Sequence, residues 1–269
     1  MMATQPGARS FDHMATHFDR FAELAGGPLD QYLESAIPKE GGQRALDLGC
    51  GTGRHASLLA TRYQQVLAVD ISQPMLDFAT ARRARPNIRY QHRDLRDVRR
   101  ETDGTFDLIL SAYALHHIPD LDATLYQIRN LCARWGWVVL VDNVAPTPAV
   151  PRRWFVSEAR RTLVADLRQH RRPRDEALEL YRLSVDPAWL DHLESDRFLS
   201  PEQFTQRYRE VFPTGRFSEL YRARAICWEE TTYLNPLGPD DLELLWSSRR
   251  DPHGRLRFDP THHEDPPTR

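Results

Sequence analysis

The stretch ALDLGCGTGR, residues 45–54, decides the fold of this chain. An apolar run that includes Asp47 leads into Gly49, Gly51 and Gly53. Glycine has no Cβ, so the backbone can adopt positive φ there and a ligand can approach the main chain closely. Residues 55–63, HASLLATRY, follow with apolar side chains at helical spacing. The stretch predicts a strand, a glycine turn and a helix, as in a nucleotide-type ligand site; a glycine loop without a ligand is the alternative.

The size and charge of the chain limit its class. A chain of 269 residues favours one domain with an insertion over two independent domains. Its 36 basic and 38 acidic residues give a net charge of -2, which argues against a dedicated nucleic-acid-binding protein. The cysteines, Cys50, Cys132 and Cys227, show no C-x-x-C pairing, so neither a disulfide framework nor a zinc knuckle is indicated. Without an apolar leader or a long apolar run, we expect a cytoplasmic protein that does not span a membrane.

Strand and helix patterns alternate through the first half of the chain. Residues 1–9 have the composition of a disordered lead, and Ser10–Ile37 predicts two amphipathic helices, so residues 1–40 are expected to form N-terminal cap helices. Strand patterns follow the glycine turn at residues 65–72, 87–95, 106–117 and 137–144, with helical patterns between them. The last of these helices is predicted at residues 121–134, with Gly136 marking its stop. Residues 41–145 therefore predict an α/β fold with a doubly wound parallel sheet.

Four motifs in this order carry a resemblance to a known family. They are DLGCGTGR at the first turn, LAVDIS at the end of the second strand, RDL after the third strand and FDLILSAYALHHIPD along the fourth. Together they resemble class I S-adenosylmethionine-dependent methyltransferases, and most closely the small-molecule branch called type 11 or UbiE-like. The resemblance implies a Rossmann-like sheet of seven strands, mostly parallel with the last strand antiparallel. It also implies S-adenosylmethionine as the methyl donor, S-adenosylhomocysteine as the product and no metal.

The resemblance assigns the cofactor-binding residues. Asp47 would approach the methionine amino group, and the backbone from Gly49 through Cys50 and Gly51 to Gly53 would pass along the methionine and ribose. Asp70 would hold the ribose hydroxyls, which agrees with its place at a strand end about twenty residues beyond the glycines. The remaining assignments are Ile71 on one adenine face, Asp94 with Leu95 at the adenine edge, and Ser111 beside the methyl-transfer channel.

The second half of the chain completes the core and adds an insertion. Residues 200–212 predict a helix capped by Ser200, and strands at 215–223 and 225–234 complete the core over residues 200–235. Residues 146–199 form a predicted helical insertion that would serve as a substrate lid, with helical patterns at residues 154–167 and 186–198. Residues 236–269 are predicted to form a C-terminal helix and mobile tail. The insertion is rich in arginine, which fits either recognition of a carboxylate or diphosphate or an ion-paired helix face. The arginines are Arg152, Arg153, Arg160, Arg161, Arg168, Arg171, Arg172 and Arg174.

The residues of the acceptor site are the least defined by the sequence. The candidate proton acceptors are His116 and His117 after the fourth strand, His13 and His17 in the N-terminal segment, and Asp142 after the fifth strand. A structural role for one of the paired histidines remains open. Candidate substrate-binding residues are Phe18, Tyr32, Tyr113, Asp142, Arg152 and Arg153.

Three functional hypotheses follow. The first is methyl transfer to an oxygen, nitrogen or carbon atom of a small molecule, such as a secondary metabolite. The second is C-methylation of an isoprenoid diphosphate or a polyketide. The third, of a different class, is a cofactor-binding cyclase scaffold or binding module that transfers no methyl group. In all three, the expected partner is a small molecule, with no nucleic acid or membrane and with a homodimer as one possible assembly.

Overall fold

The computed structural model describes residues 14–231 of the chain. The predicted lead, His13 and the predicted C-terminal helix and tail lie outside the described residues. The strands are β1 (Gly42–Leu48), β2 (Tyr63–Asp70), β3 (Ile88–His92), β4 (Phe106–Ala112), β5 (Cys132–Asn143), β6 (Arg216–Leu220) and β7 (Ala223–Glu229). The helices are α1 (Ala15–Ala25), α2 (Gly27–Ala36), α3 (Arg54–Leu59), α4 (Gln73–Arg83), α5 (Arg100–Asp103), α6 (Leu121–Leu131), α7 (Arg152–Gln169), α8 (Arg174–Ser184), α9 (Pro187–Ser195) and α10 (Pro201–Val211).

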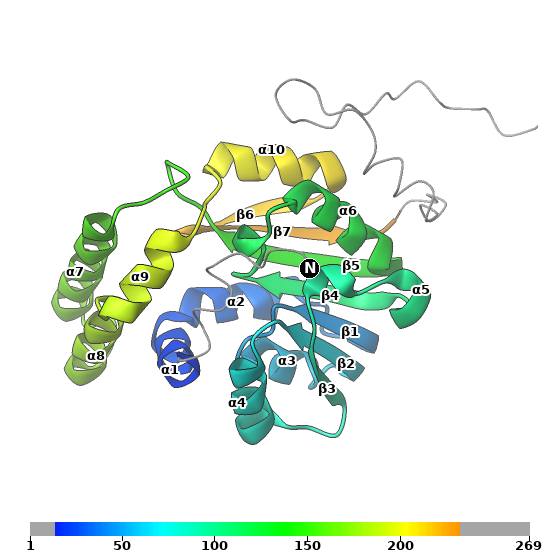
Figure 1. The fold of residues 1–269 in the computed structure, drawn as a ribbon, viewed down its shortest axis with the longest axis horizontal. Coiled ribbons are helices and arrows are strands. Elements are labelled where there is room, and N and C mark those ends of the chain that lie inside the picture. The colour runs from blue at the N-terminus through cyan, green and yellow to red at the C-terminus, as the bar shows by residue number, and fades with distance from the viewer. Residues whose placement is uncertain (1–13, 232–269) are drawn as a thin grey trace, which may run out of the picture. The chain divides into compact units, whose positions relative to one another are not determined.

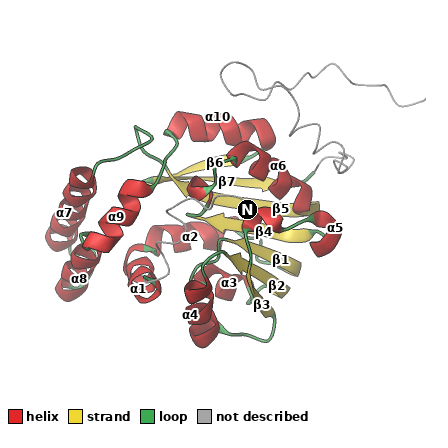
Figure 2. Ribbon diagram, viewed as in Figure 1, coloured by secondary structure: helices red, strands yellow, loops and turns green. Residues whose placement is uncertain are grey.

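The seven strands form one sheet in the order β3-β2-β1-β4-β5-β7-β6 (Figures 1 and 2). β1 to β5 are parallel, whereas β7 runs antiparallel to both β5 and β6. This confirms the predicted Rossmann-like sheet with the last strand antiparallel. Because the strand order reverses between β1 and β4, their carboxyl ends open a crevice where ligands bind in such sheets.

Alternate residues along the strands pack on opposite faces of the sheet. Ile109 of β4 belongs to a cluster with α6 and α10, whereas Leu108 and Leu110 belong to a cluster with α2, α3 and α4. Burial on both faces explains why residues 108–110 in the middle of β4 are all apolar. Ser200 and Gln203 form the capping box that begins α10, in agreement with the helix start predicted at Ser200. Among the described residues, no helix is long and apolar enough to cross a membrane.

The junction between α6 and β5 differs from the prediction. The helix ends at Leu131, and β5 begins at once at Cys132, so Gly136 lies inside the strand. Trp135 adopts a φ of 65°, and the pairing register between β4 and β5 shifts at this place. A Cβ on Gly136 would lie 2.9 Å from the Phe106 carbonyl oxygen. The glycine therefore accommodates a β-bulge where a helix stop was predicted.

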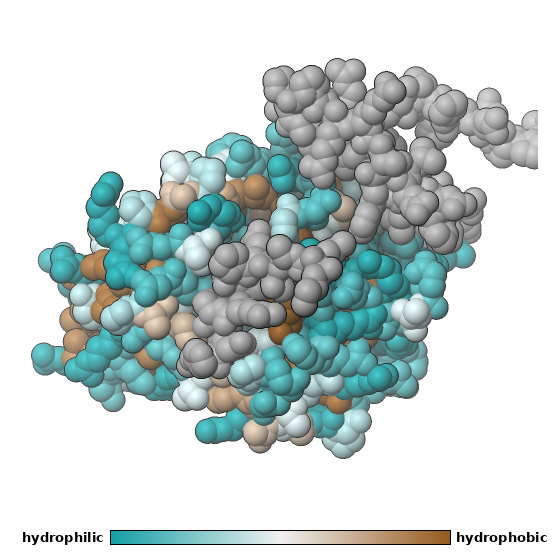
Figure 3. Space-filling view, viewed as in Figure 1, coloured by the Kyte–Doolittle hydropathy of each residue, from teal (hydrophilic) through white to brown (hydrophobic). Residues whose placement is uncertain are grey.

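The insertion consists of three helices, α7, α8 and α9, where the sequence analysis identified two helical patterns. α8 was missed. It packs against α7 and α1, and Arg20 of α1 forms an ion pair of 2.7 Å with Glu179 of α8. The face shown in Figure 3 is mostly hydrophilic, and apolar residues are visible on it at the side where α7 and α8 lie, among other places. Val164 and Leu167 of α7 are two of the exposed apolar residues.

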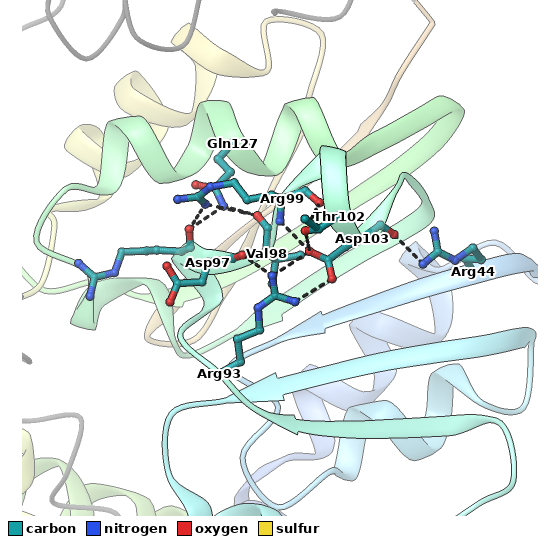
Figure 4. A network of polar contacts seen from close by, with 9 residues as sticks. Arg44, Arg93, Asp97, Val98, Arg99, Thr102, Asp103 and Gln127 are labelled. Carbon is teal, nitrogen blue, oxygen red and sulfur yellow. Dashed lines mark hydrogen bonds and ion pairs between the residues drawn. The ribbon is translucent and has the colours of Figure 1, made fainter. Parts of the chain in front are cut away.

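A polar network fixes the segment between β3 and β4 (Figure 4). The carboxylate of Asp103 accepts hydrogen bonds from both terminal nitrogens of Arg93, at 2.7 and 2.8 Å, and from the backbone N–H of Arg99 at 2.9 Å. Gln127 of α6 donates to the carbonyl oxygens of Arg96 and Val98. Because Asp94 and Leu95 lie in this segment, the network determines the position of one end of the crevice.

We predict that Asp103→Asn lowers the free energy of unfolding by about 1–3 kcal/mol, because an amide cannot accept all the charge-assisted hydrogen bonds of the carboxylate. Although burial raises the pKa of Asp103, the bonds from Arg93, Arg99 and Thr102 lower it overall to about 2. A lowered folded-state pKa stabilises the protein above the ordinary pKa of 3.8, and this stabilisation disappears as the pH falls towards 2. The difference between the two proteins in urea denaturation should therefore shrink with acidification.

Asp97→Asn is the matched control, because Asp97 contributes its backbone carbonyl to the network while its side chain is exposed. Its effect should stay within about 0.5 kcal/mol. Equal destabilisation by the two variants would contradict the importance of the Asp103 carboxylate.

Candidate functional site

A cavity of about 770 Å³ opens at the carboxyl ends of the parallel strands. Its walls come from four parts of the chain: the glycine turn after β1, the segments that follow β2, β3 and β4, the N-terminal helices, and the insertion with the β6–β7 turn. Predicted site residues that line it are Phe18, Gly49, Cys50, Gly51, Asp70, Ile71, Asp94, Leu95, Tyr113, His116 and His117. Residues far apart in sequence thus meet at one site, as expected for a doubly wound sheet.

The three glycines of the turn have different structural roles. All adopt positive φ, at 72° for Gly49, 49° for Gly51 and 76° for Gly53. A Cβ on Gly49 would lie 2.4 Å from the Ala114 side chain, and one on Gly53 would lie 2.4 Å from the Tyr90 hydroxyl. A Cβ on Gly51 would meet nothing closer than the Phe18 ring at 3.7 Å. Gly49 and Gly53 therefore serve close packing, whereas Gly51 leaves the main chain open on the cavity side.

Asp70 joins the ends of β1 and β2. Its Oδ2 accepts a hydrogen bond of 2.7 Å from the N–H of Gly51, and its Oδ1 accepts one of 2.8 Å from the N–H of Ser72. Burial raises the pKa of Asp70, and these backbone N–H groups partly oppose the shift. The carboxylate is thus held rigidly at the cavity wall with lone pairs left to accept further hydrogen bonds.

Asp47 and Ser111 lie beneath the cavity wall. Burial raises the pKa of Asp47 to about 7, with a contribution from the charge of Asp70 and an opposing one from the N–H of Ala56. Within the described residues, Oδ2 of Asp47 is buried and has no hydrogen-bond partner. Ser111 donates a 2.9 Å hydrogen bond to the Leu48 carbonyl and is fully buried, so it connects β4 to β1 and does not line the cavity.

The segment after β3 presents Asp94 and Leu95 to the cavity, with Ile71 from the segment after β2. The carboxylate of Asp94 accepts hydrogen bonds from the backbone N–H of Arg96 at 2.9 Å and from its guanidinium at 2.6 Å. Although burial raises the pKa of Asp94, these bonds lower it overall. The resemblance assigns the Asp94 carboxylate to the adenine edge, but in the structure this carboxylate is hydrogen-bonded to Arg96.

The helix α1 lies across the glycine turn. Asp19 accepts a 2.8 Å hydrogen bond from the Thr52 hydroxyl and forms an ion pair of 2.8 Å with Arg83 of α4. Phe18 of the same helix lines the cavity beside Gly51. These contacts hold the N-terminal helix against the turn that the sequence singled out, and they close one side of the cavity.

A buried cluster of three histidines and two aspartates forms another part of the wall. Nδ1 of His116 lies 2.5 Å from Oδ1 of Asp142, and its Nε2 faces Asp196. Burial lowers the pKa of His116, but the neighbouring Asp142 and Asp196 outweigh it and raise the pKa to about 10. Burial and the charge of His116 hold the pKa of His117 well below its ordinary value. His192 of α9 packs beside His117.

Several predicted residues lie elsewhere. Arg152 pairs with Asp191 and Glu194 of α9, and Arg153 is exposed on α7 outside the cavity. His17 packs beside Trp189. Tyr32 lies on α2. Neither His17 nor Tyr32 lines the cavity. Asp142 does not line it either, because its carboxylate lies behind His116. Arg161 and Arg172 of the insertion do line the cavity. Arg161 pairs with Glu158 and Arg172 with the buried Asp166, which favours the ion-paired interpretation for these two arginines.

Trp189, His192, Asp196 and Arg222 are among the cavity-lining residues that were not predicted from the sequence as site residues. The first three belong to α9 and the residue after its end, where the pattern indicated only a helix with core aromatics. Arg222 lies in the turn between β6 and β7. None of them falls in a motif with diagnostic spacing, so only the tertiary structure identifies them.

Comparison with known proteins agrees with the arrangement of this site. A family model described as a methyltransferase domain matches residues 45–136. Residues 45–136 form a methyltransferase domain. An uncharacterized methyltransferase of Mycobacterium tuberculosis is 38% identical over 118 residues, which are 44% of this chain and 59% of that protein. The trans-aconitate 2-methyltransferase of Deinococcus radiodurans is 40% identical over 105 residues, which are 38% of each chain.

The solved structures extend the fold likeness beyond the methyltransferase domain. The crystal structure of an S-adenosylmethionine-dependent methyltransferase from Mesorhizobium loti matches 77% of this chain and 99% of that chain, with a TM-score of 0.52 and 19% identity. This chain nevertheless spans only about three fifths of the curated M. tuberculosis relative and less of the D. radiodurans one. The cavity walls formed by α1, the insertion and the β6–β7 turn lie outside residues 45–136.

We predict that Asp19→Ala loosens α1 from the glycine turn. Loss of the ion pair and hydrogen bond should speed amide hydrogen exchange of α1 about five- to tenfold, because these contacts oppose local opening of the helix. Hydrogen exchange followed by mass spectrometry measures this effect directly. Glu23→Ala is the control, since Glu23 pairs with Arg20 within α1; equal acceleration in both variants would contradict the prediction.

Proposed function

We propose that this chain transfers the methyl group of S-adenosylmethionine to an oxygen, nitrogen or carbon atom of a small molecule. The observation that carries the proposal is the carboxylate of Asp70, held at the cavity wall by the N–H of Gly51 beside the open glycine turn. A carboxylate at the end of the second strand of such a sheet can accept hydrogen bonds from both ribose hydroxyls of a nucleoside. The match of residues 45–136 to a methyltransferase domain supports the same assignment.

The residues present fit this cofactor on two independent observations. A Cβ on Gly51 would have no neighbour closer than the Phe18 ring at 3.7 Å, so a ligand can approach the main chain closely there. Asp47 holds a buried carboxylate oxygen without a partner in the described region, directly under the turn. An unsatisfied buried carboxylate favours a cationic neighbour, and the methionine part of the cofactor carries an ammonium group.

When bound, S-adenosylmethionine supplies a methyl group already activated by its sulfonium charge. The contribution of the chain is then mainly positional: Asp70 holds one end of the ligand while α1 and the insertion close the cavity. Alignment of two reactants in this way contributes about 7–11 kcal/mol to lowering a barrier. Where the acceptor must lose a proton, His117 is the better-suited of the two predicted histidines at the wall, because its lowered pKa keeps it neutral whereas the raised pKa of His116 keeps that ring protonated.

We further infer that the acceptor carries an anionic group, because Arg222 offers an unpaired cation to the cavity. Its guanidinium lies 4.3 Å from the centre of the Trp154 ring and 5.5 Å from that of Phe155. In the described part of the chain, no carboxylate forms an ion pair with it, and burial lowers its pKa to about 10, so it remains charged at neutral pH. A buried arginine held by aromatic rings suits bidentate recognition of a carboxylate or phosphate.

The relative named trans-aconitate 2-methyltransferase supports a carboxylate acceptor, since aconitate is a carboxylic acid. An isoprenoid diphosphate would meet the same requirement for negative charge. A neutral polyketide would not, so the nature of the anion separates these hypotheses.

The central experiment measures cofactor binding by titration calorimetry. Asp70→Asn should weaken S-adenosylmethionine and S-adenosylhomocysteine binding about 10–100-fold, because the amide nitrogen cannot accept a hydrogen bond. The control, Asp77→Asn, alters an exposed carboxylate of α4 that bonds Gln73 and should leave the affinity unchanged. Unchanged affinity in Asp70→Asn would refute the assignment. Binding with no S-adenosylhomocysteine formed from any acceptor would favour the scaffold hypothesis instead.

A second experiment tests the anionic acceptor. A panel of carboxylic acids, phosphorylated compounds and the neutral esters of the acids is assayed for release of S-adenosylhomocysteine. Arg222→Met should lower kcat/KM for the anionic acceptors about 10–100-fold relative to their neutral esters, because it keeps an apolar contact with the rings while removing the charge. Arg153→Met, on the exposed face of α7, should leave the preference unchanged. An unaltered preference in Arg222→Met would contradict the role of this arginine.

A further inference from the structure

The histidine–aspartate cluster combines residues from the core and the insertion. His116 and His117 lie in the short 3₁₀ turn after β4, Asp142 lies near the end of β5, and Asp196 follows the end of α9. The side chain of His116 is 5% exposed and that of Asp196 is 1% exposed. Ionisable groups buried this deeply are retained at a cost unless they are paired or bind a ligand. The free-energy cost of burying this cluster would be offset by a bound ligand.

The distances within the cluster are those of ligands around a common ion. Nε2 of His116 lies 3.7 Å from Oδ2 of Asp196, and Nδ1 of His117 lies 3.4 Å from Oδ1 of the same carboxylate. Such separations exceed normal N–H···O hydrogen bonds. Two donor atoms that lie about 2.0–2.1 Å from a tetrahedral zinc ion are about 3.4 Å apart. The three residues each offer one donor atom, and all of these atoms lie within 4.8 Å of one another.

The hydrogen bonding of Asp196 also favours a bound cation. Its Oδ1 is buried and accepts no hydrogen bond from any residue that the structure describes. A buried carboxylate oxygen left unsatisfied costs free energy, whereas coordination to a cation satisfies it.

The carboxylate of Asp142 lies where it can orient the His116 ring. Oδ1 of Asp142 lies 2.5 Å from Nδ1 of His116, which leaves Nε2 of this ring facing Asp196. Histidines that bind metals commonly donate their other N–H to a carboxylate, which fixes the tautomer and ring orientation. Asp142 therefore has the geometry of an outer-shell partner, and so has His192, whose Nε2 lies 3.7 Å from Oδ2 of Asp196.

We propose that His116, His117 and Asp196 bind a divalent transition metal ion of the zinc type in the cavity wall. Two imidazoles and one carboxylate suit zinc, cobalt(II) or iron(II) better than magnesium or calcium, which prefer oxygen ligands. Three protein ligands leave a coordination position free, and all three residues line the cavity, so this position is accessible to water or to the acceptor.

This site goes beyond the proposed methyl transfer and does not depend on it. If both are correct, an acceptor oxygen bound to the metal would lose its proton more readily, because a metal ion lowers the pKa of a coordinated hydroxyl. His117 would then be a metal ligand and not the proton acceptor. The resemblance drawn from the sequence implied no metal. The proposed ligands come from segments about eighty residues apart, so no short motif marks them.

The test uses the full chain, freed of metal with a chelator and titrated with cobalt(II) as a spectroscopic probe. We expect one cobalt ion per chain, visible d–d absorption typical of a four- or five-coordinate site, and displacement by zinc. Asp196→Asn and His117→Ala should each weaken cobalt binding at least about tenfold. Elemental analysis of the purified protein measures which metal is retained. None of these measurements requires a methyl acceptor.

The controls are Asp191→Asn, which alters an exposed carboxylate of α9, and His170→Asn, which alters an exposed histidine at the end of α7. Both should bind cobalt as the unaltered chain does. Circular dichroism and S-adenosylhomocysteine binding verify that each variant is folded. No cobalt absorption from the unaltered chain, or equal absorption from Asp196→Asn, would overturn the proposal and leave His116 as a protonated imidazole between two carboxylates.

Discussion

The hydrogen bond from the N–H of Gly51 to the carboxylate of Asp70 is the constraint on which the ligand cavity depends. It connects the turn after β1 to the end of β2, the strand that pairs with β1 along its length. The second oxygen of the carboxylate binds Ser72, the N-cap of α4, so one side chain fixes the turn, the strand end and the next helix. Burial of that charge is tolerable because backbone N–H groups solvate it.

The cavity joins two regions of different character. The side formed by the glycine turn and Asp70 belongs to the methyltransferase domain, where backbone geometry and hydrogen bonds determine the shape. The opposite side is formed by α1, the insertion and the β6–β7 turn, which contribute Trp189, Asp196 and Arg222. The two sides can therefore differ in what they bind, because function resides in sites placed on a common fold.

Local sequence patterns were sufficient to predict the sheet and most of the cavity wall formed by the segments after β1, β2 and β3. Apolar strands, glycines and strand-end carboxylates are local signals, and Asp70 lies where its spacing from Gly51 predicts. The bulge at Gly136 was read as a helix stop, since a glycine after a helical pattern has the same local signature in either case. α8 was missed because its stability comes from packing on α7 and α1.

The acceptor side could not be predicted for a more general reason. Arg152 and Arg222 are both arginines near aromatic residues, yet the first pairs with carboxylates of α9 and the second has none within ion-pair distance among the described residues. No local pattern distinguishes them, because the difference depends on which charged groups the insertion brings near each one.

The same reasoning applies to Asp196, which the end of α9 carries to the histidines after β4. If this carboxylate and the histidines hold a cation, the insertion is fixed to the core by coordination at the site where the acceptor would bind. Closure of the insertion and completion of the site would then be a single event, because an open insertion would remove one of the three ligands. A site built in this way links the position of the insertion to the chemistry of the cavity through one buried side chain.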